Sequence, residues 1–152
     1  MTLLLASGGG GYAQDFQKGV EAAQKGDFAT ALREWRPLAE QGNATAQFNL
    51  GVMYRQGQGV PQDDKEAVNW YRKSAEQGYA WAQSNLGVMY GEGRGVPQDN
   101  VYAHMWFNIA ASNGHDNARS NRDLAAKRMT TEQLTEAQKL ARECVRKNYK
   151  DC

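Results

Sequence analysis

Apolar residues recur along much of this chain at the spacing of an α-helix. Ala46, Leu50 and Met53 lie at positions i, i+4 and i+7, which places them on one helix face. After a glycine-rich break, Ala67 and Trp70 begin a second apolar stripe at helical spacing. No segment alternates between apolar and polar residues for long enough to predict a strand. The pattern therefore predicts pairs of amphipathic helices joined by short loops.

The residues between two stripes carry the signals that end one helix and begin the next. Gly57 suits the left-handed backbone at a helix C-terminus, so we expect a positive φ there. Val60 precedes a proline, which favours extended backbone. Asp63 is a good N-cap, and Glu66 completes a start that resembles a capping box. The sequence thus predicts a loop that ends at Asp63.

The pattern of residues 44–79 is repeated at once by residues 80–115, at a fixed period of 36 positions. The recurring residues include Leu50 and Leu86, Met53 and Met89, Gly57 and Gly93, Pro61 and Pro97, and Trp70 and Trp106. A period of this length is typical of stacked supersecondary units that bury a core only against their neighbours. Such stacks usually hold other molecules on a surface.

The flanking segments extend the pattern in a weaker form. Residues 14–43 form an atypical first unit with a shorter connecting loop. Residues 116–152 form C-terminal capping helices, the last of which begins after Thr130 with an amide side chain three positions on. We therefore expect one domain over residues 14–152, built from about four helix pairs in which the two helices are antiparallel.

The two full copies share the motif AxAQxNLGxMYxxGxGVPQDxxxAxxWYxxAAxxG, which resembles the Sel1-like repeat, a relative of the tetratricopeptide repeat. Residues 44–115 match it twice, the first unit is closer to a tetratricopeptide repeat, and residues 116–127 resemble a degenerate first helix. The resemblance implies an all-α fold, a right-handed α–α superhelix or solenoid. It also implies a non-catalytic adaptor that binds a protein or peptide in its concave groove.

In tetratricopeptide-like stacks, the first helix of each unit lines the concave surface. By this resemblance, the stripe beside the packing stripe faces the groove. We expect the partner-binding residues to be Thr45, Phe48, Asn49, Val52, Arg55, Trp81, Ser84, Asn85, Val88, Glu92 and Asn117. Trp81 is the sharpest candidate, because its ring offers a large apolar contact and an N–H donor. Two alternatives stay open: Trp81 only fills space against Phe48 or a neighbouring helix, and the asparagines tie neighbouring helices together.

A second function is consistent with the same repeats, that of a structural subunit that docks through its end units into a larger cell-envelope assembly. The two functions differ in where exposed apolar and aromatic side chains gather, in the groove or at the ends of the array. The net charge of +1 indicates no strong field that would recruit nucleic acid or a membrane surface. No apolar run approaches the roughly 20 residues of a membrane span. We expect a monomer.

The charge is unevenly distributed along the chain. Residues 1–115 carry 9 Lys or Arg against 11 Asp or Glu, whereas residues 116–152 carry 9 against 6. The cationic end could contact an acidic partner through Arg142, Arg146, Lys147 and Lys150. The other interpretation is that the end of a helix simply favours cations near its C-terminus.

Nothing in the sequence marks a catalytic centre or a cofactor site. The glycine-rich loops lack the third glycine of a dinucleotide fingerprint and the lysine of a P-loop. His104 lies beside core positions of its repeat, which favours a partly buried helix residue over a general base. The cysteines and histidines lack metal-ligand spacing. We expect no enzyme activity, no cofactor and no metal.

The two cysteines, Cys144 and Cys152, are separated by seven residues near the end of the chain. In the cysteine-rich branch of the Sel1-like family, a pair at this spacing ties the second helix of a unit to the next segment of the chain. The resemblance therefore implies a disulfide, in agreement with an oxidising compartment. The alternative is that Cys144 is a small buried hydrophobe and Cys152 a free thiol.

Residues 1–13 stand apart from the repeats. Leu3–Ala6 is apolar, and Gly11 and Ala13 fit the small residues of a signal-peptidase site, with Gln14 as the mature start. The segment is interpreted as a disordered leader, either a signal-peptide remnant or an unrelated sequence. We therefore expect a periplasmic or secreted protein of a bacterial cell envelope, with a cytoplasmic protein as the alternative.

Overall fold

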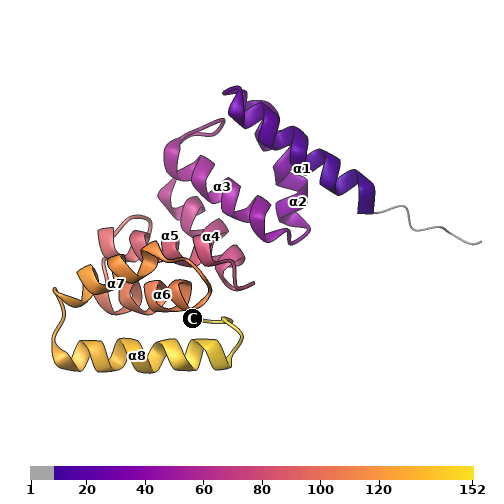
Figure 1. Ribbon diagram of the computed structural model, residues 1–152. Coiled ribbons are helices and arrows are strands. Elements are labelled where there is room, and N and C mark those ends of the chain that lie inside the picture. The colour runs from indigo at the N-terminus through magenta and orange to yellow at the C-terminus, as the bar shows by residue number, and fades with distance from the viewer. Residues whose placement is uncertain (1–8) are drawn as a thin grey trace, which may run out of the picture.

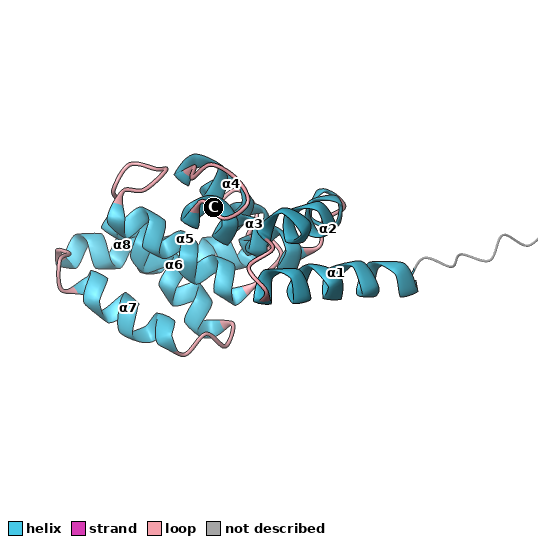
Figure 2. Cartoon of the chain, turned by 90° about the horizontal axis from the view of Figure 1, so that it is seen from above, coloured by secondary structure: helices cyan, strands magenta, loops and turns pink. Residues whose placement is uncertain are grey.

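A computed structural model describes residues 9–152 of the chain, and these residues form eight α-helices and no strand (Figures 1 and 2). The all-α solenoid predicted from the repeats is confirmed. The helices are α1 (Gly9–Gln24), α2 (Phe28–Glu40), α3 (Ala44–Gln56), α4 (Asp64–Ala75), α5 (Ala80–Glu92), α6 (Asn100–Ser112), α7 (Asn117–Ala126) and α8 (Thr131–Arg146).

The first helix begins earlier than expected. α1 starts at Gly9, so the expectation that the chain is disordered as far as Ala13 is wrong for residues 9–13. No proline or capping residue between Gly11 and Gln14 stops the helix from extending toward the N-terminus. The remainder of the proposed leader, residues 1–8, lies outside the described residues, and its processing stays a prediction.

Three consecutive helix pairs, α1–α2, α3–α4 and α5–α6, stack on one another through α2 with α3 and α4 with α5. The same buried amide contact recurs at each junction. Gln47 Nε2 donates to the Ala39 carbonyl oxygen at 3.0 Å, and Gln83 Nε2 donates to the Ala75 carbonyl oxygen at 3.1 Å. These side chains are almost fully buried, so each amide fixes the register of one unit on the next.

The helix boundaries follow the signals in the sequence. Gly57 and Gly93 both have a φ of 66°, as predicted, and their N–H groups donate to carbonyl oxygens of the preceding helix. The Asp63 side chain accepts hydrogen bonds from the first turn of α4. Thr130 forms a complete capping box with Gln133 at the start of α8.

The last two helices do not form a regular pair. α7 and α8 both pack against α6 and scarcely touch each other, so the antiparallel arrangement expected for the fourth pair is absent. α7 buries only Ala118 and offers α8 no apolar stripe. The small residues of α8, Ala141 and Cys144, instead pack in the cluster that contains Trp106 and Ile109 of α6. Figure 1 shows α6 with α7 and α8 on different sides of it.

A disulfide joins Cys144 to Cys152, with their α-carbons 5.5 Å apart, as the family resemblance implied. The tail between them turns back through Tyr149, whose φ is 65°. The Tyr149 hydroxyl donates to the Asn113 side-chain oxygen at 3.2 Å, and its ring lies over Gly78. The tail therefore closes the core at the junction of the second and third units.

Candidate partner-binding site

The first helices of successive units present equivalent residues to one side of the stack, here called the first-helix face. The packing stripe is fully buried, since Leu50 and Leu86 have no exposed surface. The neighbouring stripe is left on the first-helix face of α3, α5 and α7. Its equivalent positions are Asn49, Asn85 and Asn121; Val52, Val88 and Leu124; and Gln56, Glu92 and Arg128.

A hollow of about 230 Å³ lies between α5 and α7, above α6. Two of the expected residues, Val88 and Glu92, form its α5 wall. Leu124 of α7, which is 57% exposed, and Arg128, which follows α7, form the opposite wall. Sequence reasoning missed these two residues, although the repeat register that pairs Val52 with Val88 points directly to Leu124.

Space in this hollow comes from a difference between the repeats. Gly91 lines the hollow, whereas the equivalent residue in the preceding unit is Arg55. An added Cβ at Gly91 would make only ordinary contact, with Ala103 at 3.6 Å. The absent side chain at Gly91 therefore opens a space between α5 and α7.

A second hollow, of about 210 Å³, lies where α3 meets α1 and α2. Three of the residues expected to contact a partner, Phe48, Asn49 and Val52, line it together with Trp35 of α2. Phe48 is half-buried rather than free, because its ring packs against Tyr71 and Tyr79 with centroids 5.9 and 5.4 Å away. This hollow offers a partner mainly apolar surface.

Trp81 is the most exposed of the expected aromatic contacts, at 55%. It does not pack against Phe48; its ring meets the edge of His115 at a centroid distance of 4.3 Å. Trp81, Asp116 and Asn117 line a third hollow of about 270 Å³ near the first turns of α5 and α7. The indole therefore stands at the surface, beside polar groups of the next unit.

Other residues of the expected stripe are less available. Ser84 is only 3% exposed, because its short side chain does not rise out of the packed interface, and its proposed role as a contact is withdrawn. Thr45 is half-buried. Asn85 is also half-buried and lies beside the Tyr71 hydroxyl. Asn85 makes no hydrogen bond of ordinary geometry to this hydroxyl, so the alternative in which the asparagines tie neighbouring helices together stays a prediction.

The Tyr71 hydroxyl is buried and has no hydrogen-bond partner of ordinary geometry. Burial raises its pKa, whereas the Asn85 amide and the charges of Arg55 and Arg94 act to lower it. Because burial dominates, Tyr71 stays neutral over the physiological range and acts as a core residue.

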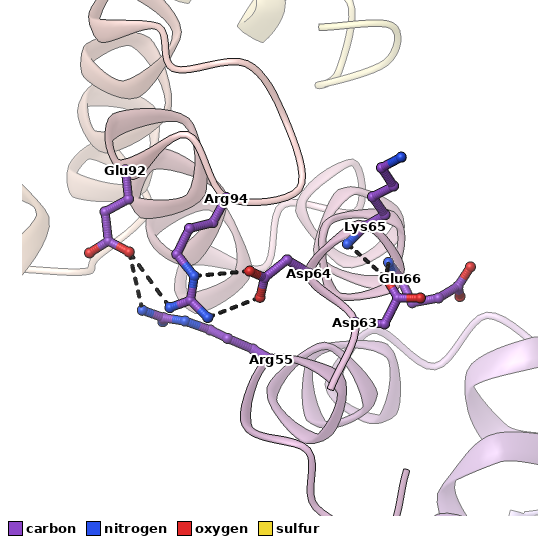
Figure 3. A network of polar contacts seen from close by, with 7 residues as sticks. All are labelled: Arg55, Asp63, Asp64, Lys65, Glu66, Glu92 and Arg94. Carbon is purple, nitrogen blue, oxygen red and sulfur yellow. Dashed lines mark hydrogen bonds and ion pairs between the residues drawn. The ribbon is translucent and has the colours of Figure 1, made fainter. Parts of the chain in front are cut away.

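Charged side chains bridge α3, α4 and α5 at one edge of the first-helix face (Figure 3). Arg94 donates from Nε and Nη2 to both carboxylate oxygens of Asp64, at 3.1 and 3.0 Å. Glu92 lies 3.8 Å from both Arg94 and Arg55. The expected contacts Arg55 and Glu92 are therefore brought together, and a partner that approaches here meets an ion pair rather than two free charges.

Within residues 9–152, no cluster of three or more His, Cys, Asp or Glu side chains could hold a metal ion. His104 is almost fully buried, and burial lowers its pKa, with the Arg122 charge acting in the same direction. Among the helices of the described part of the chain, none is both long and apolar enough to span a membrane.

Comparison with known proteins identifies the repeat. The sequence model of the Sel1 repeat family matches residues 44–79 and 82–115. The chain contains two Sel1 repeats. Sel1 repeats typically mediate protein–protein interaction, and the fold is generally a non-catalytic scaffold.

Two solved structures resemble this Sel1 repeat protein. One is a protective antigen present in uropathogenic Escherichia coli strains, which displays an SLR fold; it is 32% identical, with a TM-score of 0.86 over 92% of this chain. The other is a Sel1 repeat protein from Oxalobacter formigenes, 35% identical, with a TM-score of 0.64 over 68% of this chain. The chain spans 32% and 41% of the lengths of these two proteins. No curated protein matches it.

Proposed function

We propose that this Sel1 repeat protein binds an extended segment of a partner protein along its first-helix face. One observation carries the proposal. Trp81 is more than half exposed at the hollow that also contains Asn117, and the hollow lined by Val88 and Leu124 lies farther along the same two helices, α5 and α7. An exposed indole beside polar side chains is typical of an interface anchor.

Exposed apolar groups lie both on this face and at the ends of the array. Of the four large hydrophobic side chains that stand out in the described part of the chain, Trp81 and Leu124 lie at hollows of the first-helix face. The other two, Tyr12 and Val145, lie on the terminal helices α1 and α8 and suit the alternative of docking through the end units.

The test uses Trp81→Ala, with Tyr12→Ala as the matched control, because both aromatic side chains are about half exposed. A photo-crosslinking residue at position 81 first captures the partner from the envelope fraction of the source cells. Calorimetry with the purified partner should then show that Trp81→Ala weakens binding by about 2 kcal/mol. Unchanged binding by this variant, or an equal loss with Tyr12→Ala, would contradict the proposal.

We also propose that the protein works outside the cytoplasm. The disulfide between Cys144 and Cys152 supports this proposal, since disulfides persist mainly in oxidising compartments. One structural relative is, moreover, described as an antigen. Rapid alkylation of thiols in intact source cells, followed by mass spectrometry, should find the pair oxidised. Recovery of two alkylated thiols would contradict an exported location.

A further inference from the structure

The second half of α6 has an open face, because α7 and α8 lie on either side of it and do not close over it. Asn108 and Ser112 lie on this face and line two adjoining hollows. One hollow, of about 410 Å³, separates α6 from α8, and the other, of about 270 Å³, separates α6 from α7. We call this continuous depression the α6 trough.

The trough is distinct from the first-helix face. The α6 residues that border the hollow beneath α5 and α7 are Asn100, Ala103 and Phe107, whereas Asn108 and Ser112 border the trough. On α7, the first-helix face uses Leu124 and its neighbours, whereas the trough uses Arg119 and Arg122. None of the residues that line the trough lines a hollow of the first-helix face.

The floor of the trough beside α8 is apolar. Ile109 and Ala141 form it and are 2% and 4% exposed, so they lie below the surrounding surface. Val145 borders the same hollow and is 48% exposed. A valine left half in water beside a recessed apolar floor can bury further area against one inserted apolar side chain.

The rim of the trough is cationic. Arg142 and Arg146 project from α8, and Arg119 and Arg122 from α7. No Asp or Glu lines either hollow. Arg122 pairs with Asp123 at 2.9 Å, but the ion pairs found within residues 9–152 involve none of the other three arginines.

We propose that the α6 trough binds an acidic amphipathic segment of a partner protein. One apolar side chain of the segment enters the hollow over Ile109 and Val145. Its carboxylates pair with Arg142 and Arg146, and with Arg119 across the trough. Guanidinium groups bind carboxylates through charge-assisted hydrogen bonds, and charge complementarity selects an acidic segment over a basic one.

The shape of the trough argues against two other anionic ligands. A lipid surface cannot reach Ile109 and Ala141, because both are recessed and only Val145 protrudes. Single-stranded nucleic acid binds where bases stack on aromatic side chains, and no aromatic residue lines the two hollows. A peptide side chain fits an apolar recess with a cationic rim.

The test measures fluorescence anisotropy of a labelled peptide in which leucines are flanked by glutamates, with the full chain as receptor. The test variant combines Arg142→Glu with Arg146→Glu. The control combines Lys127→Glu with Lys139→Glu, which changes the net charge of the protein equally but alters exposed residues that do not line the trough. Circular dichroism melting curves establish that both variants fold.

We expect the test variant to weaken peptide binding at least about tenfold, with a change of less than about twofold in the control. Replacing the glutamates of the peptide by lysine, or its leucines by serine, should abolish binding. In heteronuclear NMR, the amide signals of Ile109, Ser112 and Val145 should move on titration with the peptide.

Other results overturn the proposal. One is failure of the glutamate–leucine peptide to bind at millimolar concentration. Another is that peptide binding is weakened equally by both charge variants, or is weakened by Trp81→Ala. Binding of anionic vesicles or of an oligonucleotide, with the same dependence on Arg142 and Arg146 and in preference to the peptide, would assign the trough to that ligand. Self-association abolished by the same variants would assign it to a second copy of this chain. Because Trp81→Ala alters only the first-helix face, this test and that of the proposed function can fail separately.

Discussion

Single residues at equivalent repeat positions have acquired different properties. Val68 in α4 and His104 in α6 are 36 positions apart, and each is 4% exposed. The valine is an ordinary core residue, whereas the histidine buries a ring nitrogen, Nδ1, that has no hydrogen-bond partner. Burial of an unpaired polar atom reduces stability, so this position is a weak point of the third unit.

His104 should make the stability of the protein depend on pH. Burial lowers its folded-state pKa below the ordinary value, the Arg122 charge lowers it further, and Asp123 opposes them. As the pH falls from about 7 to about 5, the unfolded chain therefore binds a proton on this residue before the folded chain does. Stability is thus fully present above the ordinary histidine pKa and is lost as the pH falls toward the folded-state value.

The variant His104→Val copies the residue of the preceding repeat and removes this titration. We expect it to be at least as stable as the parent at neutral pH, and to lose less stability on acidification. Thermal unfolding followed by circular dichroism at a series of pH values measures both effects. Parallel curves for the two proteins would mean that His104 is not the group responsible.

At the scale of elements, the loops do more than connect helices. Arg94, in the loop after α5, donates two hydrogen bonds to Asp64 at the start of α4. The loop thereby contacts the preceding unit. Gly95, the next residue, lies so close to α4 that an added Cβ would overlap the Asp64 carbonyl oxygen. The loop of one unit is therefore fitted to the backbone of the unit before it.

This close approach predicts unequal effects of two glycine substitutions. Gly26 and Gly95 have similar φ values, 77° and 72°, but a Cβ at Gly26 would meet nothing within 4 Å. Gly26→Ala should therefore destabilise by about 1 kcal/mol, through backbone strain alone. Gly95→Ala should cost about 2 kcal/mol more, because the loop must move away from α4. Urea unfolding measures the difference, and equal effects would refute the close contact.

At the scale of the whole molecule, regular stacking and its interruption create two different surfaces. Three regular pairs place equivalent residues of α3 and α5 on the first-helix face, and α7 continues that face. The interruption at α8 leaves the α6 trough open, and the tail tied by Cys144 and Cys152 returns to the core. The net charge of +1 gives no sign that the two surfaces differ in local charge, because the cationic rim belongs to the α6 trough only.

The sequence by itself determined the local structure of the repeats. Helical spacing of Leu50 and Met53, the left-handed glycine at position 57 and the cap at Asp63 act over a few residues, and all are observed. The fixed period then implied stacking, because such units bury a core only against their neighbours. The same register identified Trp81 as lying outside the packing stripe, and it is exposed in the structure.

Tertiary structure alone decided the depth of single side chains and the arrangement of the last helices. Ser84 lies on the expected stripe, yet the neighbouring helices cover it, and sequence spacing contains no measure of that depth. α8 packs on α6 rather than on α7, because the large apolar side chains that its small residues require are those of α6. Spacing along the chain defines which residues share a helix face. Which face finds a partner depends on the shape and volume of side chains distant in sequence, and these contacts exist only in the folded chain.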